Sequence, residues 1–464
     1  MEEVKPDSPR IQKLKESARK ISIREGALAT VQGGFGDSYI TPFALALNST
    51  NAQIALLSSF PGLLGPISQW FGSKLIETKS RKKVVLFAIL FQSLMWIPII
   101  LLSFLYWKGV FAGTLPILLI VFFSAYVIFG NLATPAWFSW MGEIVKDKER
   151  GRYFSKRNRI AAIVAVVCSI LAAFFLDFFR KNKMILLGFS IFFFLAMIFR
   201  LLSRELFKKQ YEPKLKLQKG YYFSFHDFIK KAPKNNFGKF TIYRSLINFA
   251  TFIAGPFFAV YMLKNLGFSY VTFMIVNLSS TIFSILALPA IGKFSDTYGN
   301  YETMKISSIL IAVFPVLWLF SSSPIYLFFG PMMITGLAWT AFNLAAGNFV
   351  YDSVTPQKRA IAVTYHNILI GVGVFLGACL GGLLLTYIDI RFMEPLLFVF
   401  IISAVARGII SMVMLPMIKE IKEVQKFNTE KTLRNMVLNT INIPQQWHHS
   451  SFGLFFKKKT KESK

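Results

Sequence analysis

The sequence predicts an all-α membrane protein in which twelve transmembrane helices form two six-helix bundles that repeat one another. Of its 464 residues, 54% are hydrophobic and only 16% are charged, whereas about a quarter of the residues in a soluble domain are charged. Apolar runs of about 20 residues, the length that crosses a bilayer, recur twelve times. Lysine and arginine are concentrated in alternate segments between these runs, as in a chain that crosses the membrane repeatedly.

The apolar runs fall into two sets of six. The first six lie near residues 26–48, 51–73, 84–107, 113–141, 160–179 and 184–203, and the second six near 238–263, 270–292, 303–320, 325–350, 360–386 and 393–416. Pro and Gly inside several runs are tolerated, because neighbouring membrane helices satisfy the freed backbone groups. We therefore expect a cytoplasmic N-terminal segment (1–25), an N-terminal bundle (26–203), a basic cytoplasmic linker (204–237), a C-terminal bundle (238–416) and a basic cytoplasmic tail (417–464).

The basic residues also predict the orientation. With a cytoplasmic N-terminus, the cytoplasmic segments carry 43 of the 52 Lys and Arg residues and the opposite segments carry 6. This bias is typical of cytoplasmic loops, so we expect a multi-pass plasma-membrane protein with both termini in the cytoplasm. The formal net charge of +29 then reflects topology rather than nucleic-acid binding. We expect a monomer whose partners are the lipid bilayer and a small solute.

The linker contains an aromatic and basic patch. Phe223, Phe225 and Phe228 lie beside Lys230 and Lys231, a pattern that suits a short helix on an anionic membrane face. The alternative is a flexible connection between two halves.

The two halves repeat weakly in sequence. An offset of 209 residues aligns Arg150 with Arg359, and an offset of 207 aligns Arg200 with Arg407. Each pair falls at corresponding positions of the two sets of spans. Two parallel repeats of six spans are a transporter architecture.

The loop after the second span of each half carries a motif of the major facilitator superfamily, which the chain resembles. The second half has it as Gly292-Lys293-Phe294-Ser295-Asp296-Thr297-Tyr298-Gly299. The first half, from Gly72 to Lys82, has its acid one place late, as Glu77, and lacks the second glycine. The segments 140–145 and 256–263 are similar to a prokaryotic permease branch whose members mostly lack an assigned substrate. The resemblance spans about residues 25–420 and leaves out the tail.

The resemblance implies a cytoplasmic latch between the halves. A loop carboxylate can accept hydrogen bonds from free N–H groups at a helix N-terminus and can pair with arginine. Asp296 would meet the start of the fifth span near Arg150, and Glu77 would meet the start of the eleventh near Arg359, which stabilises an outward-facing state. The alternative is a pair of solvated loop acids.

Small residues recur at four-residue spacing in the fifth and eleventh spans, including Gly373, Gly377 and Gly381. Such a face lets another helix approach closely. The partner could lie across the interface between the halves or within one half, and the pattern does not distinguish them.

The resemblance also implies that the first and fourth spans of each half line a central cavity. Their polar and aromatic residues are the candidate substrate or ion pathway: Asp37, Tyr39, Asn131, Trp137, Arg244, Asn248, Trp339 and Asn343. Asp37 lies near the middle of the first span, where an ionisable group is costly and is by default a functional hypothesis. It could carry a proton, or it could be a structural acid bonded to a neighbouring helix. Arg244 could hold an anionic substrate, pair with Asp37, or extend to the cytoplasmic surface.

No Gly-x-x-x-x-Gly-Lys-[Ser/Thr] loop, metal-ligand cluster or nucleophile motif is present in the sequence. We therefore expect no enzyme and no cofactor. The sequence favours a secondary active transporter that moves a small solute by alternating access, coupled to protons. The alternative is a non-transporting sensor, assembly or lipid-handling protein on the same scaffold.

Overall fold

The computed structural model describes residues 8–145, 149–213, 224–389 and 391–425, without the side chains of residues 150, 151, 356, 357 and 360. The first half contains α1 (Pro9–Phe35), α2 (Ile40–Ala46), α3 (Asn51–Thr78), α4 (Arg81–Leu94), α5 (Trp96–Trp107), α6 (Leu115–Ile144), α7 (Arg150–Lys181) and α8 (Ile185–Lys209). The second contains α9 (Phe225–Lys231), α10 (Asn236–Ala254), α11 (Phe257–Val260), α12 (Tyr270–Val313), α13 (Pro324–Phe329), α14 (Pro331–Ser353), α15 (Pro356–Tyr387) and α16 (Pro395–Met414).

Side-chain caps and backbone breaks set where these helices begin and end. The Thr50 hydroxyl accepts a hydrogen bond from the Gln53 amide and the Gln53 side chain accepts one from Thr50, so α3 starts at a capping box. The Ser80 hydroxyl caps the start of α4 by accepting a hydrogen bond from the Lys83 amide. Inside α12, Gly299 has a φ of 90° and divides the helix into two parts.

The helices account for the twelve expected spans. Nine stretches of the described residues are long and apolar enough to cross a membrane. One of them, 270–319, contains two expected spans on either side of Gly299. The other two spans are α3 and the broken pair α1 and α2. The prediction of an all-α protein with twelve spans in two six-helix bundles is confirmed.

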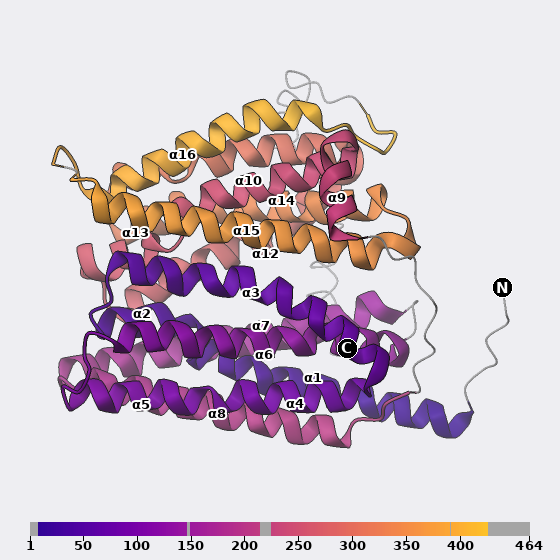
Figure 1. Ribbon diagram of the computed structural model, residues 1–464, viewed down its shortest axis with the longest axis horizontal. Helices are drawn as coiled ribbons and strands as arrows, with labels where there is room; N and C mark the ends of the chain where they lie inside the picture. The colour runs from indigo at the N-terminus through magenta and orange to yellow at the C-terminus, as the bar shows by residue number, and fades with distance from the viewer. Residues whose placement is uncertain (1–7, 146–148, 214–223, 390, 426–464) are drawn as a thin grey trace, which may run out of the picture.

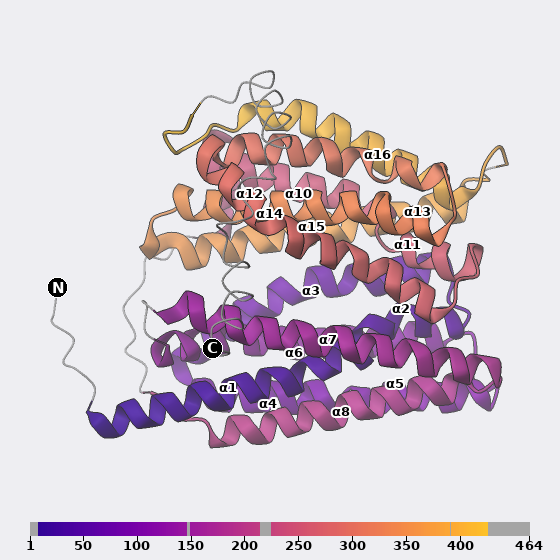
Figure 2. The same ribbon diagram turned by 180° about the vertical axis from the view of Figure 1, so that it is seen from behind.

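The two halves form two layers. Figures 1 and 2 show α1–α8 in one layer and α10–α16 in the other, with their helices roughly aligned. The main contacts between the layers are those of α3 with α15 and of α7 with α12, and α11 also contacts α2 and α3. The Gly371 Cα approaches α3 so closely that an added Cβ would lie 2.6 Å from the Gly62 carbonyl oxygen.

The glycine stripe of α15 faces its own half. A Cβ on Gly373, Gly377 or Gly381 would lie 2.0–2.2 Å from backbone carbonyl oxygens of α10. The stripe therefore brings α15 against α10, while Gly371 and Gly382 contact α3 across the interface. In α7 the corresponding face packs on α1, with Cys168 against Gly34.

The short helix α9 crosses one end of the bundle (Figure 1). Phe228 is buried, and its ring centroid lies 5.6 Å from that of Tyr365 in α15. Phe225 and Ile229 are 38% and 40% exposed. A short helix therefore forms in the linker and docks on the second half, and its placement on a membrane face stays a prediction. Phe223 and the tail beyond residue 425 lie outside the described residues. We call the end where α1 begins and α9 lies the basic end, and the end where α7 stops and α12 starts the opposite end.

Candidate functional site

A break in the first span places Asp37. Helix α1 ends at Phe35, a 3₁₀ turn covers Asp37–Tyr39, and α2 starts at Ile40. An added Cβ on Gly36 would lie 2.5 Å from the Trp96 ring, so the turn needs glycine to approach α5. Tyr39 is fully buried and donates a hydrogen bond of 2.5 Å to the Ser169 carbonyl. This bond fixes the turn against α7 and points the Tyr39 ring into the core of the first half.

The Asp37 carboxylate is held by one hydrogen bond and is otherwise open. The Tyr126 hydroxyl of α6 donates to its Oδ1 at 2.5 Å, and the Gln32 amide donates to the Tyr126 oxygen. Tyr126 and Gln32 are buried, with 3% and 5% exposure, whereas Asp37 is exposed. A carboxylate that accepts a hydrogen bond from a buried donor and is itself exposed can bind and release a proton or a ligand group.

Helix α1 also carries Glu25, twelve residues before Asp37, and Glu25 belongs to a buried ion network that the sequence did not reveal. Glu25 is 2% exposed, and its two carboxylate oxygens face Arg157 of α7 at 3.3 Å and Arg200 of α8 at 3.8 Å. The Ser203 hydroxyl donates to the same carboxylate at 2.9 Å. We had placed Glu25 in the cytoplasmic segment 1–25, because no apolar run includes it. Arg200, an arginine inside a predicted span, was the available sign of this network, because a charge inside a span usually has a partner.

The second half places Arg244 on neutral partners. Its Nη2 donates to the exposed Asn343 side chain of α14 at 3.1 Å, and Asn248 donates to its carbonyl at 2.8 Å. Trp339 packs edge-on against Phe342, with centroids 5.7 Å apart. Within the described residues Arg244 has no ion pair, and it does not pair with Asp37. Arg244, Asn248, Trp339 and Asn343 thus gather on neighbouring faces of α10 and α14.

Two further candidates connect helices of the first half. The side-chain amide oxygen of Asn131 accepts a hydrogen bond of 2.7 Å from the Gln69 side chain of α3. The Trp137 ring lies under the Arg157 guanidinium at 4.6 Å. Trp137 therefore belongs to the Glu25 network, while Asn131 connects α6 with α3.

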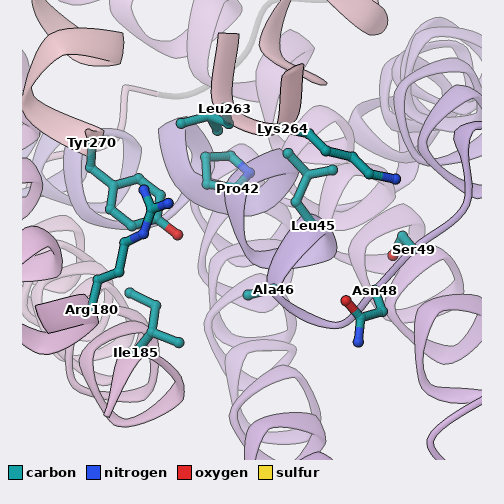
Figure 3. A pocket seen from close by; sticks show the side chains of 10 residues that line it. All are labelled: Pro42, Leu45, Ala46, Asn48, Ser49, Arg180, Ile185, Leu263, Lys264 and Tyr270. Carbon is teal, nitrogen blue, oxygen red and sulfur yellow. The ribbon is translucent and has the colours of Figure 1, made fainter. Parts of the chain in front are cut away.

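The opposite end is closed by contacts between the halves. The Asp177 carboxylate of α7 accepts hydrogen bonds from the Tyr270 and Val271 amides at 2.8 and 3.0 Å, and so caps the start of α12. Arg180 donates to the Phe268 carbonyl at 3.2 Å, and its guanidinium lies over the Tyr270 ring (Figure 3). The pocket drawn in Figure 3, of about 350 Å³, lies beside this closure.

At the basic end, Asp296 makes no matching contact with the described residues. Asp296 is exposed and has no hydrogen bond or ion pair with any described residue. Arg359 donates instead to the Tyr351 and Val354 carbonyls at the end of α14. Glu77 is exposed near the end of α3, and the Arg150 side chain lies outside the described part. The latch stays a prediction that concerns a different conformation.

The family model of the Major Facilitator Superfamily matches residues 26–238 and 240–459. The chain belongs to the Major Facilitator Superfamily. The match extends past residue 420, so our expectation that the tail lies outside the resemblance was wrong. The branch within the superfamily stays a prediction.

Curated relatives of the chain include two solute carriers. Solute carrier family 22 member 18 of Rattus norvegicus is 27% identical over 135 residues, which is 28% of this chain and 32% of the relative. Solute carrier family 67 member A1 of Homo sapiens is also 27% identical, over 28% of this chain and 31% of its own length. The alignments thus span about a third of each relative.

Solved structures of transporters share the fold. The nucleoside transporter NupG superposes with a TM-score of 0.62 at 17% identity, over 87% of this chain and 98% of that one. A bacterial homologue of the iron transporter ferroportin in an inward-facing state gives 0.58 at 15% identity, over 88% and 99%. At these identities the likeness concerns the fold and assigns no substrate.

Proposed function

We propose that this protein is a secondary active transporter that moves a small solute across the plasma membrane by alternating access, coupled to protons. The difference between its two ends is the observation that carries the proposal. Asp177 and Arg180 close the opposite end across the interface of the halves. At the basic end, Asp296 makes no such contact with the described residues.

A transporter of this kind needs one gate to close while the other opens. The predicted contacts of Asp296 and Glu77 would supply the closure of the basic end. In the proposed orientation the basic end faces the cytoplasm, so the present conformation opens inward. The monomer contains both halves and therefore needs no second copy to alternate.

Asp37 is the proposed proton carrier. Asp37 lies at a helix break and is exposed, and the Tyr126 hydroxyl of α6 donates a hydrogen bond to its carboxylate. Binding of a proton removes a charge that is costly in the membrane. Because the helix is broken at Asp37, the local backbone can move. The carboxylate can then change its hydrogen-bond partners when the halves move.

Thermal unfolding of the purified protein with a solute panel tests the proposal. Sugars, amino acids, organic acids, nucleosides and hydrophobic cations are compared at pH about 5.5 and about 8, because a ligand of the native state raises the unfolding midpoint. We expect one chemical class to raise the midpoint in a pH-dependent manner. In Asp37→Asn the shift should no longer depend on pH.

Asp389→Asn is the matched control, because Asp389 is 68% exposed and pairs with the exposed Arg391. It should keep the pH dependence. A solute shift that is equally pH-dependent in Asp37→Asn would reject the role of Asp37. A panel without any shift would favour a sensor or assembly protein on the same scaffold.

A further inference from the structure

A second cavity lies inside the first half, beside the Glu25 network. It has a volume of about 280 Å³ and is lined by residues of α1, α4, α6, α7 and α8. Its polar wall is Glu25, Arg157 and Arg200, and its aromatic wall includes Trp137, Phe138 and Phe207. A site with two guanidiniums on one side and rings on the other fits an organic anion with an apolar body.

Glu25 occupies the position that a ligand carboxylate would take. Arg157 faces one of its oxygens and Arg200 faces the other. Each arginine is also anchored from behind, since the Arg157 Nε donates to the Ser22 carbonyl at 3.2 Å and the Arg200 Nε donates to Gln92 at 3.0 Å. The guanidiniums therefore stay in place when Glu25 leaves them.

The charged side chains among the residues that line the cavity are two arginines and one acid, Glu25. On α7, the Tyr153 hydroxyl donates to the Arg19 carbonyl. Helices α4 and α6 present the neutral side chains of Gln92 and Trp137. A proton on Glu25 thus leaves both guanidiniums without a carboxylate in this lining.

We propose that Arg157 and Arg200 form a binding site for the carboxylate of an organic anion, with Glu25 as its internal competitor. The proposal rests on the proposed transport function and names its substrate class. A proton binds the Glu25 carboxylate, its contacts to the two guanidiniums weaken, and the ligand carboxylate takes them over. On release the proton leaves Glu25, which pairs with the arginines again, so one proton accompanies one anion.

Binding of benzoate, compared with neutral benzamide, tests the site directly. Glu25→Gln has no carboxylate to compete for the arginines, so we expect it to bind benzoate about tenfold tighter than the original protein at pH about 7.5. Benzamide should bind neither. Titration in weak buffer should show about one more proton taken up per benzoate by the original protein than by Glu25→Gln.

Two further variants separate this site from its surroundings. Glu25→Gln combined with Arg157→Gln should lose the gain in benzoate affinity. Glu205→Gln, an exposed glutamate of α8 paired with Lys208, should behave like the original protein. Thermal unfolding without ligand shows whether each variant is folded. If the double variant is not folded, Arg157→Lys replaces Arg157→Gln in it.

The outcomes also separate this proposal from proton coupling at Asp37. Benzoate binding by Glu25→Gln should persist when Asp37→Asn is added. Equal affinity of Glu25→Gln and the original protein for benzoate would overturn the site, whatever Asp37 does in transport. Equal binding of benzamide would overturn it as well.

Discussion

In the first half, Arg157 and Arg200 both face Glu25, whereas in the second half the hydrogen bonds of Arg244 and Arg407 to described residues go to neutral oxygens. Arg407 is completely buried, and it donates to the Ile311 and Thr251 carbonyls at 2.9 and 3.2 Å. Arg200 and Arg407 are equivalent positions in the repeat. The same place in the scaffold is therefore part of an ion network in one half and a neutral support in the other.

This difference suggests a division of tasks. The first half holds two acids that can exchange protons, the buried Glu25 and the exposed Asp37. The second half contributes Arg244, a cation without a carboxylate partner among the described residues. The first half would then handle both the proton and the anion of the proposed site, while the second half adds a positive group.

The basic end repeats the contrast. Arg81 makes two hydrogen bonds to Glu143, at 3.0 and 3.1 Å, and Asn300 makes one to Asp352 at 2.9 Å. Glu143 and Asp352 are related by the same offset of 209 residues that aligns Arg150 with Arg359. Asp352 also pairs with Lys422 at 3.3 Å, and Lys422 is 47% exposed, whereas Arg81 is 1% exposed. The cation is therefore buried in the first half and exposed in the second.

Substitution of the residues that bind Glu143 and Asp352 should have unequal effects. Arg81 is 1% exposed, so Arg81→Ala leaves Glu143 without its cation and should cost about 3–5 kcal/mol of stability. Asn300→Ala removes a hydrogen bond to a charged group, at about 1.5–3 kcal/mol. Thermal unfolding of both variants measures the difference. A larger loss in Asn300→Ala would break the comparison.

Close helix contacts should matter in both halves, through different helices. An added Cβ would lie 2.6 Å from Cys168 at Gly34 and 2.0 Å from the Phe249 carbonyl at Gly377. We expect Gly34→Ala and Gly377→Ala each to cost about 1–3 kcal/mol by overpacking. Gly408→Ala on α16, with no atom within 4 Å of its added Cβ, is the control. Equal unfolding midpoints for all three would contradict the packing described.

The contact between the halves at the opposite end should have the smallest effect. Asp177→Asn removes the charge that faces the start of α12, worth about 0.5–1 kcal/mol. This should raise the labelling rate of Ser49→Cys, in a background without Cys168 and Cys379, by about two- to fivefold. Asp389→Asn should leave the rate unchanged. A rate that Asp177→Asn does not alter would mean that the carboxylate does not hold this end closed.

Periodic apolar runs and charge asymmetry were sufficient to predict the spans and their grouping, because both depend on residue type alone. The site was predicted less completely. Asp37 and Arg244 stand out as charges inside apolar runs, but Glu25 and Arg157 lie in polar sequence. Packing of α1, α7 and α8 buries Glu25 and leaves Arg157 15% exposed. Likewise, the partner of the α15 glycines depends on helix rotation, which spacing does not determine.

Proton movement in liposomes tests the central proposal most directly. The protein is reconstituted with a pH-sensitive dye inside, and the solute that raises its unfolding midpoint is added outside. We predict proton influx with the original protein and with Asp389→Asn, and a clearly smaller influx with Asp37→Asn although that variant still binds the solute. Undiminished proton influx in Asp37→Asn would contradict the account.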